Sequence, residues 1–290
     1  VWYNSTTGNL RVDGMVLAAS WAAGGNLNVG RSIAGLNAGT QTAGIAFGGY
    51  LGLPGNTTST ETYNGSSWTN VTALSTARRA GAGFGTQAAA ALGGGYGTSS
   101  STNATEEWGG SSWTGGGVMP GSFHNTSGCG TQTAGLSNGA SEGPTQACKY
   151  NGTAWTAVSS LPSGRTQGGT AGTSAAAIAA GGFGTDTQSY EWGGSSWTAG
   201  GTLNSGRPGG VNMFGIQTAA IIGGNPSPTA TEEYNGTAWS ITGATMGTAK
   251  NSYGTGGTTT AGLAFGSSPY STGTEEFTGA TVITKNITTS

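Results

Sequence analysis

The chain has 290 residues, of which only 7% are Asp, Glu, Lys or Arg, and its formal net charge is −2. A balance so close to neutral excludes the strongly basic surface that grips phosphate backbones, so we expect no nucleic-acid partner. No apolar run approaches the roughly 18 residues that cross a bilayer, so we expect no membrane span.

Residues 1–20 precede the repeats described below and are interpreted as an entry segment, the end of an upstream fibre region. They carry neither the positive region nor the apolar region of a signal peptide. Because the chain lacks an initiator Met, we expect it to be processed or to be a piece of a longer protein.

A hairpin with an aromatic residue on each side of a tight turn recurs along the chain. The second aromatic falls at positions 68, 113, 155, 197 and 239, which gives steps of 45, 42, 42 and 42 residues. The turns contain Asn-Gly or Gly-Gly, which supply the positive φ angles of a primed hairpin turn. We therefore expect paired strands, c and d, around the segments 63–68, 108–113, 150–155, 192–197 and 234–239.

Upstream of each hairpin lies a short apolar segment that ends, in most repeats, at a pair of glycines. Such segments indicate buried strands b, each preceded by a strand a. Ala and Gly dominate these strands, as expected where strands crowd near a propeller axis. Four short strands with turns fill roughly 42 residues, the size of one propeller blade. The sequence thus predicts an all-β fold, a β-propeller of about six blades, with strands b within 41–49, 87–95, 132–140, 174–182, 217–224 and 259–267.

The two ends of the repeat array differ from its middle. Residues 20–27 are similar to the strand-d region 196–203, whereas the last strand c, at 274–279, is followed by Val282 where a Trp is expected. We favour the interpretation in which the N-terminal strand d completes the last blade and closes the ring. In the alternative, residues 281–287 form their own strand d, and the N-terminal segment packs elsewhere or begins a seventh blade.

The Gly pair that ends strand b, the aromatic of strand c, the Trp of strand d and an Arg about ten residues later together resemble the kelch repeat. The resemblance covers roughly residues 21–282, and the third repeat departs from it by lacking the Gly pair and the Arg. It implies a kelch-like β-propeller over residues 21–290, and most such propellers are binding scaffolds. Residues 2–12, and the Tyr-Asn-Gly-Thr-Ala-Trp style of the repeats, also resemble bacteriophage tail-fibre and other virion proteins.

Candidate catalytic groups are few. His124 is the one histidine, and a catalytic triad needs a His that is oriented by a carboxylate, whereas Asp13 and Asp186 lie far from it in sequence. The copper site of galactose oxidase, a kelch-type enzyme, needs several His and Tyr ligands, and no sialidase-type Asp-box pattern occurs. We therefore expect no enzymatic activity, no cofactor and no metal.

Cys129 and Cys148 are the two cysteines of the chain. They are expected on strands a and c of one blade, about 9–10 Å apart across two strand spacings. That separation is too long for a disulfide, so we interpret both as buried free thiols.

Charged residues follow the repeat in two columns. The basic column, which begins strand a and has Phe123 in its sixth place, contains Arg31, Arg78, Arg165, Arg207 and Lys250. The acidic column, two residues before the strand-c aromatic, contains Glu61, Glu106, Glu232 and Glu275. One interpretation, which we favour, pairs each cation with a Glu. In the other, the basic column rings one mouth of the channel and binds anionic ligands, which makes it the candidate ligand-binding site.

The strand-d Trp residues are interpreted as core between blades, with stacking on sugars as the alternative. The variable b–c loops, 51–59, 96–103, 141–145 and 225–229, are better candidates for specificity. We expect a non-enzymatic virion module, a tail-fibre, spike or decoration protein, whose partners are other virion proteins and host-surface polysaccharide. The alternatives are a secreted or cell-surface lectin or adhesin, and a structural hub that binds only proteins.

Overall fold

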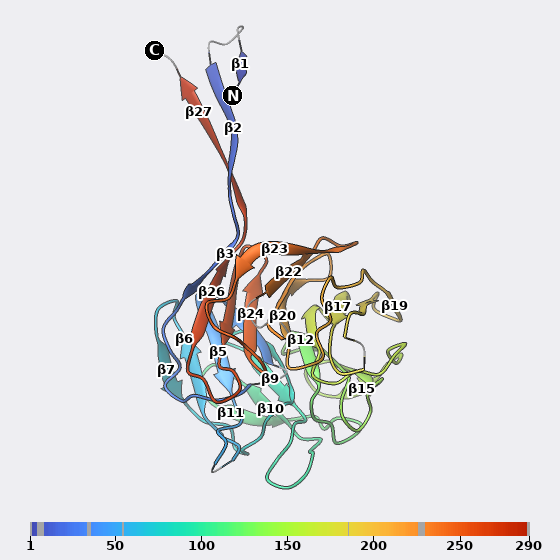
Figure 1. The fold of residues 1–290 in the computed structure, drawn as a ribbon. Coiled ribbons are helices and arrows are strands. Elements are labelled where there is room, and N and C mark those ends of the chain that lie inside the picture. The colour runs from blue at the N-terminus through green and yellow to red at the C-terminus, as the bar shows by residue number, and fades with distance from the viewer. Residues whose placement is uncertain are drawn as a thin grey trace.

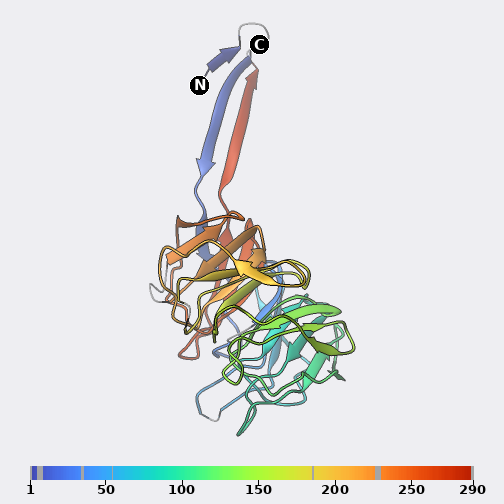
Figure 2. The same ribbon diagram turned by 90° about the vertical axis from the view of Figure 1, so that its right-hand side faces the viewer.

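The computed structural model describes residues 2–4, 9–33, 36–53, 55–184, 186–225 and 230–288, and every regular element within them is a β-strand. The strands form a rounded body and a narrow ribbon that projects from it, with both chain ends at the far end of the ribbon (Figures 1 and 2). The predicted all-β class is confirmed. No helix that could cross a membrane occurs in the described part of the chain.

The body is built from four-stranded antiparallel sheets, which we number along the chain. Each contains a strand a, b, c and d in that order, and neighbouring strands pair. Strand β4 also pairs in parallel with β8 and β24, which links three of the sheets through their first strands. The sheets are sheet 1, β4 (Leu36–Thr40), β5 (Ala43–Phe47), β6 (Thr60–Tyr63) and β7 (Trp68–Val71); sheet 2, β8 (Ala82–Gly85), β9 (Ala90–Gly93), β10 (Thr105–Trp108) and β11 (Trp113–Gly116); sheet 3, β12 (Ser127–Thr131), β13 (Ala134–Asn138), β14 (Ala147–Tyr150) and β15 (Trp155–Ala157); sheet 4, β16 (Gly169–Gly172), β17 (Ala177–Ala180), β18 (Ser189–Trp192) and β19 (Trp197–Ala199); sheet 5, β20 (Asn212–Ile216), β21 (Ala219–Gly223), β22 (Ala230–Tyr234) and β23 (Trp239–Thr245); and sheet 6, β24 (Gly254–Thr258), β25 (Ala261–Phe265), β26 (Thr274–Thr278) and β3 (Ser20–Ala23).

The strand positions follow the predicted repeat, but the c–d turns use their residues differently from the prediction. In sheet 1, Tyr63 pairs with Trp68 and only Gly65 of the turn adopts a positive φ, of 91°. The preceding Asn64 instead accepts hydrogen bonds at Oδ1 from the backbone N–H groups of Ser66, at 3.0 Å, and Ser67, at 2.9 Å. A single positive φ at the first central residue is typical of a type II′ hairpin turn, one of the two primed types.

The first strands of the sheets lie close together in the middle of the body. They contact one another in chain order, and β24 contacts β4. The second strands also approach the preceding sheet and require small residues, because a Cβ atom on Gly262 of β25 would lie 2.2 Å from the ring of Phe214. A Cβ atom on Gly135 would lie 2.4 Å from the ring of Phe84, again in the preceding sheet. This crowding explains why Gly and Ala dominate the inner strands.

The N-terminal strand β3 supplies the fourth strand of sheet 6. It pairs with β26 in an antiparallel register that places Trp21 opposite Phe277. This is the strand pairing that we favoured from the sequence. In the alternative, residues 281–287 would have occupied this place, and they do not.

The ribbon consists of β1 (Trp2–Asn4), β2 (Asn9–Leu17) and β27 (Thr281–Thr288). Strand β27 pairs with β2, so residues 281–288, which were expected within the propeller domain 21–290, lie outside the body (Figure 1). The last β2–β27 pair, Leu17 with Thr281, and the first β3–β26 pair, Ser20 with Thr278, share one register. Sheet 6 therefore continues directly into the ribbon.

The strand-d Trp residues pack between sheets, as predicted. Trp68 is only 5% exposed and its ring contacts that of Phe265 at 4.9 Å between centroids. The indole N–H groups donate to a hydroxyl at the start of strand c in the preceding sheet, which ties neighbouring sheets together. The pairs are Trp21 with Thr231, Trp68 with Thr274, Trp113 with Thr60, Trp155 with Thr105 and Trp239 with Ser189.

Sheet 4 lacks this tie. The indole Nε1 of Trp197 is buried without a hydrogen-bond partner among the described residues. The equivalent first residue of strand c in sheet 3 is Ala147, which has no hydroxyl and is itself only 2% exposed. An unpaired buried donor costs about 1–3 kcal/mol, so this position is a weak point between sheets 3 and 4.

We expect Ala147→Thr to raise the free energy of unfolding by about 1 kcal/mol, because it supplies the acceptor that Trp197 lacks. Denaturant unfolding followed by Trp fluorescence measures the change. Ala147→Val is the matched control, since it adds the same volume without a hydroxyl. Equal stability of the Thr and Val variants would contradict the role of the hydrogen bond.

Both cysteines are free and buried, on β12 and β14 with β13 between them. Burial raises the pKa of Cys129 to about 12 and that of Cys148 to about 11. Because the thiolate is the reactive form, we expect neither cysteine to react with a thiol reagent in the native protein at pH 8. Both should react once the chain is unfolded, and rapid labelling of the native protein would contradict the burial.

Candidate functional site

The five members of the basic column lie inside the body. Each is at most 1% exposed, and Arg165 is the one that lacks a carboxylate partner among the described residues. Burial lowers the pKa of Arg31 to about 10, and the charge of Glu61 opposes that shift. Four of the five cations pair with a Glu, as in the interpretation that we favoured. Ligand binding by the basic column stays a prediction. The pairs are Arg31–Glu61 at 3.1 Å, Arg78–Glu106 at 3.1 Å, Arg207–Glu232 at 3.0 Å and Lys250–Glu275 at 3.6 Å.

Each paired carboxylate also holds the connector that leads into its sheet. Glu61 Oε2, for example, accepts the backbone N–H of Asn28 at 2.7 Å. The equivalent donors in sheets 2, 5 and 6 are the backbone N–H groups of Ser75, Asn204 and Gly247. One carboxylate therefore neutralises a buried cation and fixes the path of the chain between two sheets.

Sheets 3 and 4 contain neither the carboxylate acceptor nor the backbone N–H donor of this bond. The Glu is replaced by Cys148 in sheet 3 and by Tyr190 in sheet 4, and the connector donor is replaced by Pro120 and Pro162. Proline has no N–H, so the missing acceptor leaves no unsatisfied donor there. In sheet 4 the buried Arg165 instead lies over the ring of Tyr190, with its guanidinium carbon 5.1 Å from the ring centroid.

We expect Arg31→Met to lower the free energy of unfolding by about 3–5 kcal/mol, because it leaves Glu61 buried without a cation. Adding Glu61→Leu should recover part of that loss, since no uncompensated charge then remains. Denaturant unfolding at pH 7 compares the two variants. A double variant that is less stable than Arg31→Met would contradict the ion-pair account.

A groove open to solvent lies between sheets 1 and 2, where their b–c loops come together. Its volume is about 340 Å³, and its walls include Tyr50, Leu53, Asn56, Arg79 and Tyr96. We call it the tyrosine–arginine groove. The Arg79 guanidinium carbon lies 4.1 Å from the ring centroid of Tyr50 and 5.1 Å from that of Tyr96.

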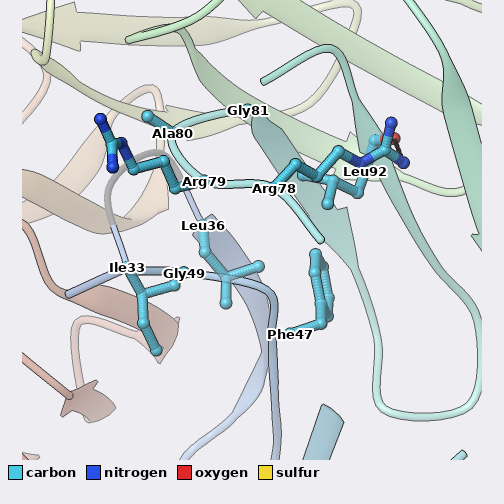
Figure 3. A pocket seen from close by; sticks show the side chains of 9 residues that line it. All are labelled: Ile33, Leu36, Phe47, Gly49, Arg78, Arg79, Ala80, Gly81 and Leu92. Carbon is cyan, nitrogen blue, oxygen red and sulfur yellow. Dashed lines mark hydrogen bonds between the residues drawn. The ribbon is translucent and has the colours of Figure 1, made fainter. Parts of the chain in front are cut away.

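Arg79 is held beside Tyr96 by an isolated β-bridge, in which its backbone N–H donates to the Tyr96 oxygen at 3.1 Å. Figure 3 shows the two guanidinium groups on opposite sides of the chain, with Arg78 directed toward Leu92. The small pocket between them, which Ile33, Leu36 and Phe47 also line, has a volume of about 10 Å³. That volume is about one water molecule, so this pocket belongs to the packing of the body.

Ring contacts extend the groove on both sides. The Tyr50 ring meets that of Tyr270 from sheet 6 at 5.7 Å, and the Tyr96 ring meets that of His124 at 5.1 Å. Tyr270 is 42% exposed. A continuous row of aromatic and basic side chains therefore crosses loops of four neighbouring sheets, 6, 1, 2 and 3.

His124 forms a cluster with Ser101 and Glu142. Its Nδ1 atom lies 2.5 Å from Glu142 Oε1 and 2.9 Å from Ser101 Oγ, and the Ser101 hydroxyl also donates to Glu142. Burial pushes the pKa of Glu142 upward, but hydrogen bonds from Ser101 and His124 outweigh burial and hold it below its ordinary value. A catalytic triad uses the two ring nitrogens for different partners, whereas here both partners share one.

A second cavity of about 200 Å³ lies beside the groove, and Tyr50 and Arg79 line both. Its other walls come from the connectors that enter five sheets: Ser32, Ala80, Asn125, Gln167 and Ser252. The last four have φ between 54° and 57°, a left-handed conformation that is uncommon for residues other than glycine. The cavity is polar and open, and no Asp or Glu side chain lines it.

The groove lies between the loops 51–59 and 96–103, which are candidates for specificity on the sequence alone. Tyr50 and Arg79 were not among the candidate residues. The available signal was an aromatic residue directly after a Gly pair in two successive repeats, and a second Arg beside Arg78. Glu142 lies in the predicted loop 141–145, whereas the predicted loop 225–229 lies, beyond Asn225, outside the described residues.

No protein-family profile matches the chain, and a search of the curated proteins finds no match. Within the described residues, no group of three or more His, Cys, Asp or Glu side chains is arranged to hold a metal ion.

Proposed function

We propose that the body is a kelch-like β-propeller of six blades, sheets 1 to 6, closed by the N-terminal strand β3. Backbone hydrogen bonds between successive connectors support a closed ring. Gln167 N donates to Asn125 O at 3.0 Å, Ser252 N donates to Gly210 O at 2.7 Å, and Ile33 N donates to Ser252 O at 2.7 Å. The last of these joins the first blade of the chain to the sixth.

The middle of the proposed ring is filled rather than open. Asn37 on β4 donates from its side-chain amide to the Thr170 backbone oxygen on β16 at 2.9 Å. These strands belong to blades 1 and 4, which face each other across a ring of six. A ligand therefore has access to the loops of this proposed propeller rather than to a passage through it.

We infer that the protein is a non-enzymatic attachment module that binds glycans at the tyrosine–arginine groove. The observation that carries this function is a solvent-open groove with tyrosine rings, an arginine and an asparagine in its walls. Aromatic rings present flat apolar surfaces for the C–H faces of sugars, and a few polar groups orient the hydroxyls.

The position of the groove suits attachment. The b–c loops of sheets 1 and 2, coloured blue to teal, lie at the end of the body remote from the ribbon (Figures 1 and 2). The ribbon carries both chain ends, so an assembly that holds the ribbon would present these loops outward. We propose a virion tail fibre, spike or decoration protein, outside cells, with other virion proteins at the ribbon; this context rests on the sequence resemblance.

We expect the purified chain to bind at least one class of bacterial surface polysaccharide on an array, saturably. Tyr50→Ala and Tyr96→Ala should each weaken that binding about tenfold, a loss of about 1.4 kcal/mol from one stacking surface. Phe183→Ala is the matched control, because Phe183 is an exposed aromatic at the equivalent place after the Gly pair of sheet 4. Absence of binding to every glycan by the folded chain would overturn the function.

A further inference from the structure

Arg79 differs from the other arginines of the body. Of the five arginines whose side chains the structure describes, it is the one that is not buried. Among the described residues no carboxylate lies within ion-pair distance of it, and neither the groove nor the neighbouring cavity has an Asp or Glu in its walls. Glu142, the nearest acid along the aromatic row, is engaged by His124. The groove therefore carries an uncompensated positive charge.

The guanidinium is held in place while most of its donors stay available. The rings of Tyr50 and Tyr96 flank it at 4.1 and 5.1 Å, which fixes its position. Its one hydrogen bond within the described residues runs from Nη1 to Asn56 Oδ1 at 3.3 Å. A guanidinium has five N–H donors, so the remaining ones are free for a ligand.

Asn56 links the Arg79 guanidinium to the loop of sheet 2. Its side-chain amide nitrogen donates to the backbone oxygens of Tyr96, at 2.8 Å, and Gly97, at 2.7 Å. These two bonds fix which end of the amide faces Arg79 and tie the loop of sheet 1 to that of sheet 2. The groove is thus preorganised, with the cation and both rings set before a ligand arrives.

We propose that the tyrosine–arginine groove selects acidic saccharides, whose oxyanion group binds the free edge of Arg79 while the sugar ring packs on Tyr50 or Tyr96. The proposal rests on the glycan-binding function and adds the ligand class to it. A planar guanidinium matches a carboxylate or a phosphate through paired N–H bonds, so uronate and phosphodiester sugars share this chemistry. Neutral sugars would use the rings and leave the charge unpaired.

Calorimetric titration of the full chain tests the proposal with oligogalacturonate, its methyl ester and a phosphorylated mannan. We expect at least one acidic ligand to bind ten times more tightly than the ester, and its binding to weaken as salt is added. Preference for the uronate alone, or for the phosphate alone, supports the proposal and identifies the source of the oxyanion. Equal binding of the ester and of both acidic ligands would overturn it and leave glycan binding intact.

Arg79→Gln should remove the preference for the acidic ligand, and Arg79→Lys should restore it only in part, because Lys lacks the paired donors. Lys149→Gln is the control, since it makes the same change of charge on β14, away from the groove. A thermal melt checks that each variant folds. If a variant does not fold, the salt dependence of acidic-ligand binding by the unaltered chain tests the proposal instead. An unchanged preference in Arg79→Gln, or binding of neutral glycans only, would overturn the proposal. Failure of every saccharide to bind would overturn the proposed function as well.

Discussion

The close approach of the first two strands of each sheet to the preceding sheet is the constraint on which the body depends. At Gly262 and Gly135 a single added carbon would overlap an aromatic ring of the neighbouring sheet. Rings such as Phe214 and Phe84 can therefore fill the space between sheets only because the residue that faces each ring is a glycine. A chain this rich in glycine can therefore form a densely packed interior, because the aromatic rings of one sheet fill the space beside the glycines of the next.

The carboxylate ties show how the repeat tolerates variation. The Arg, the Glu and the connector N–H form one unit in which each group satisfies another, so the loss of one would leave a buried charge or donor unpaired. Sheet 3 replaces all three at once, with Phe123, Cys148 and Pro120. Sheet 4 keeps the cation, sets Arg165 against an aromatic ring and removes the donor with Pro162. The acceptor and the connector donor are therefore absent together in both sheets. The connectors keep a shared backbone bond, from Met119 N–H to Asn103 O and from Leu161 N–H to Thr145 O, as from Leu74 N–H to Thr58 O in sheet 1.

The features that could be predicted from the sequence are those that occur in several repeats. The strand order, the packing of the strand-d Trp and the Arg–Glu pair each recur, so one alignment of the repeats predicts many residues. The groove could not be predicted in the same way, because no other repeat has an Arg at the position of Arg79, and Arg79 meets Tyr50 only when the chain folds. The pairing of β27 with β2 was also missed, since it joins distant segments that have no counterpart in the repeats.

The continuous register between the ribbon and sheet 6 has a mechanical consequence. Strands β2 and β27 run from the body to the same end of the ribbon, so drag on the body pulls both strands in the same direction. The hydrogen bonds between them then carry little shear, and the tension passes into the body through β3 and β26, which are paired with each other. Force along the ribbon would thus be shared by two strands of the same backbone. A single-stranded tether would concentrate the force on one edge of the sheet.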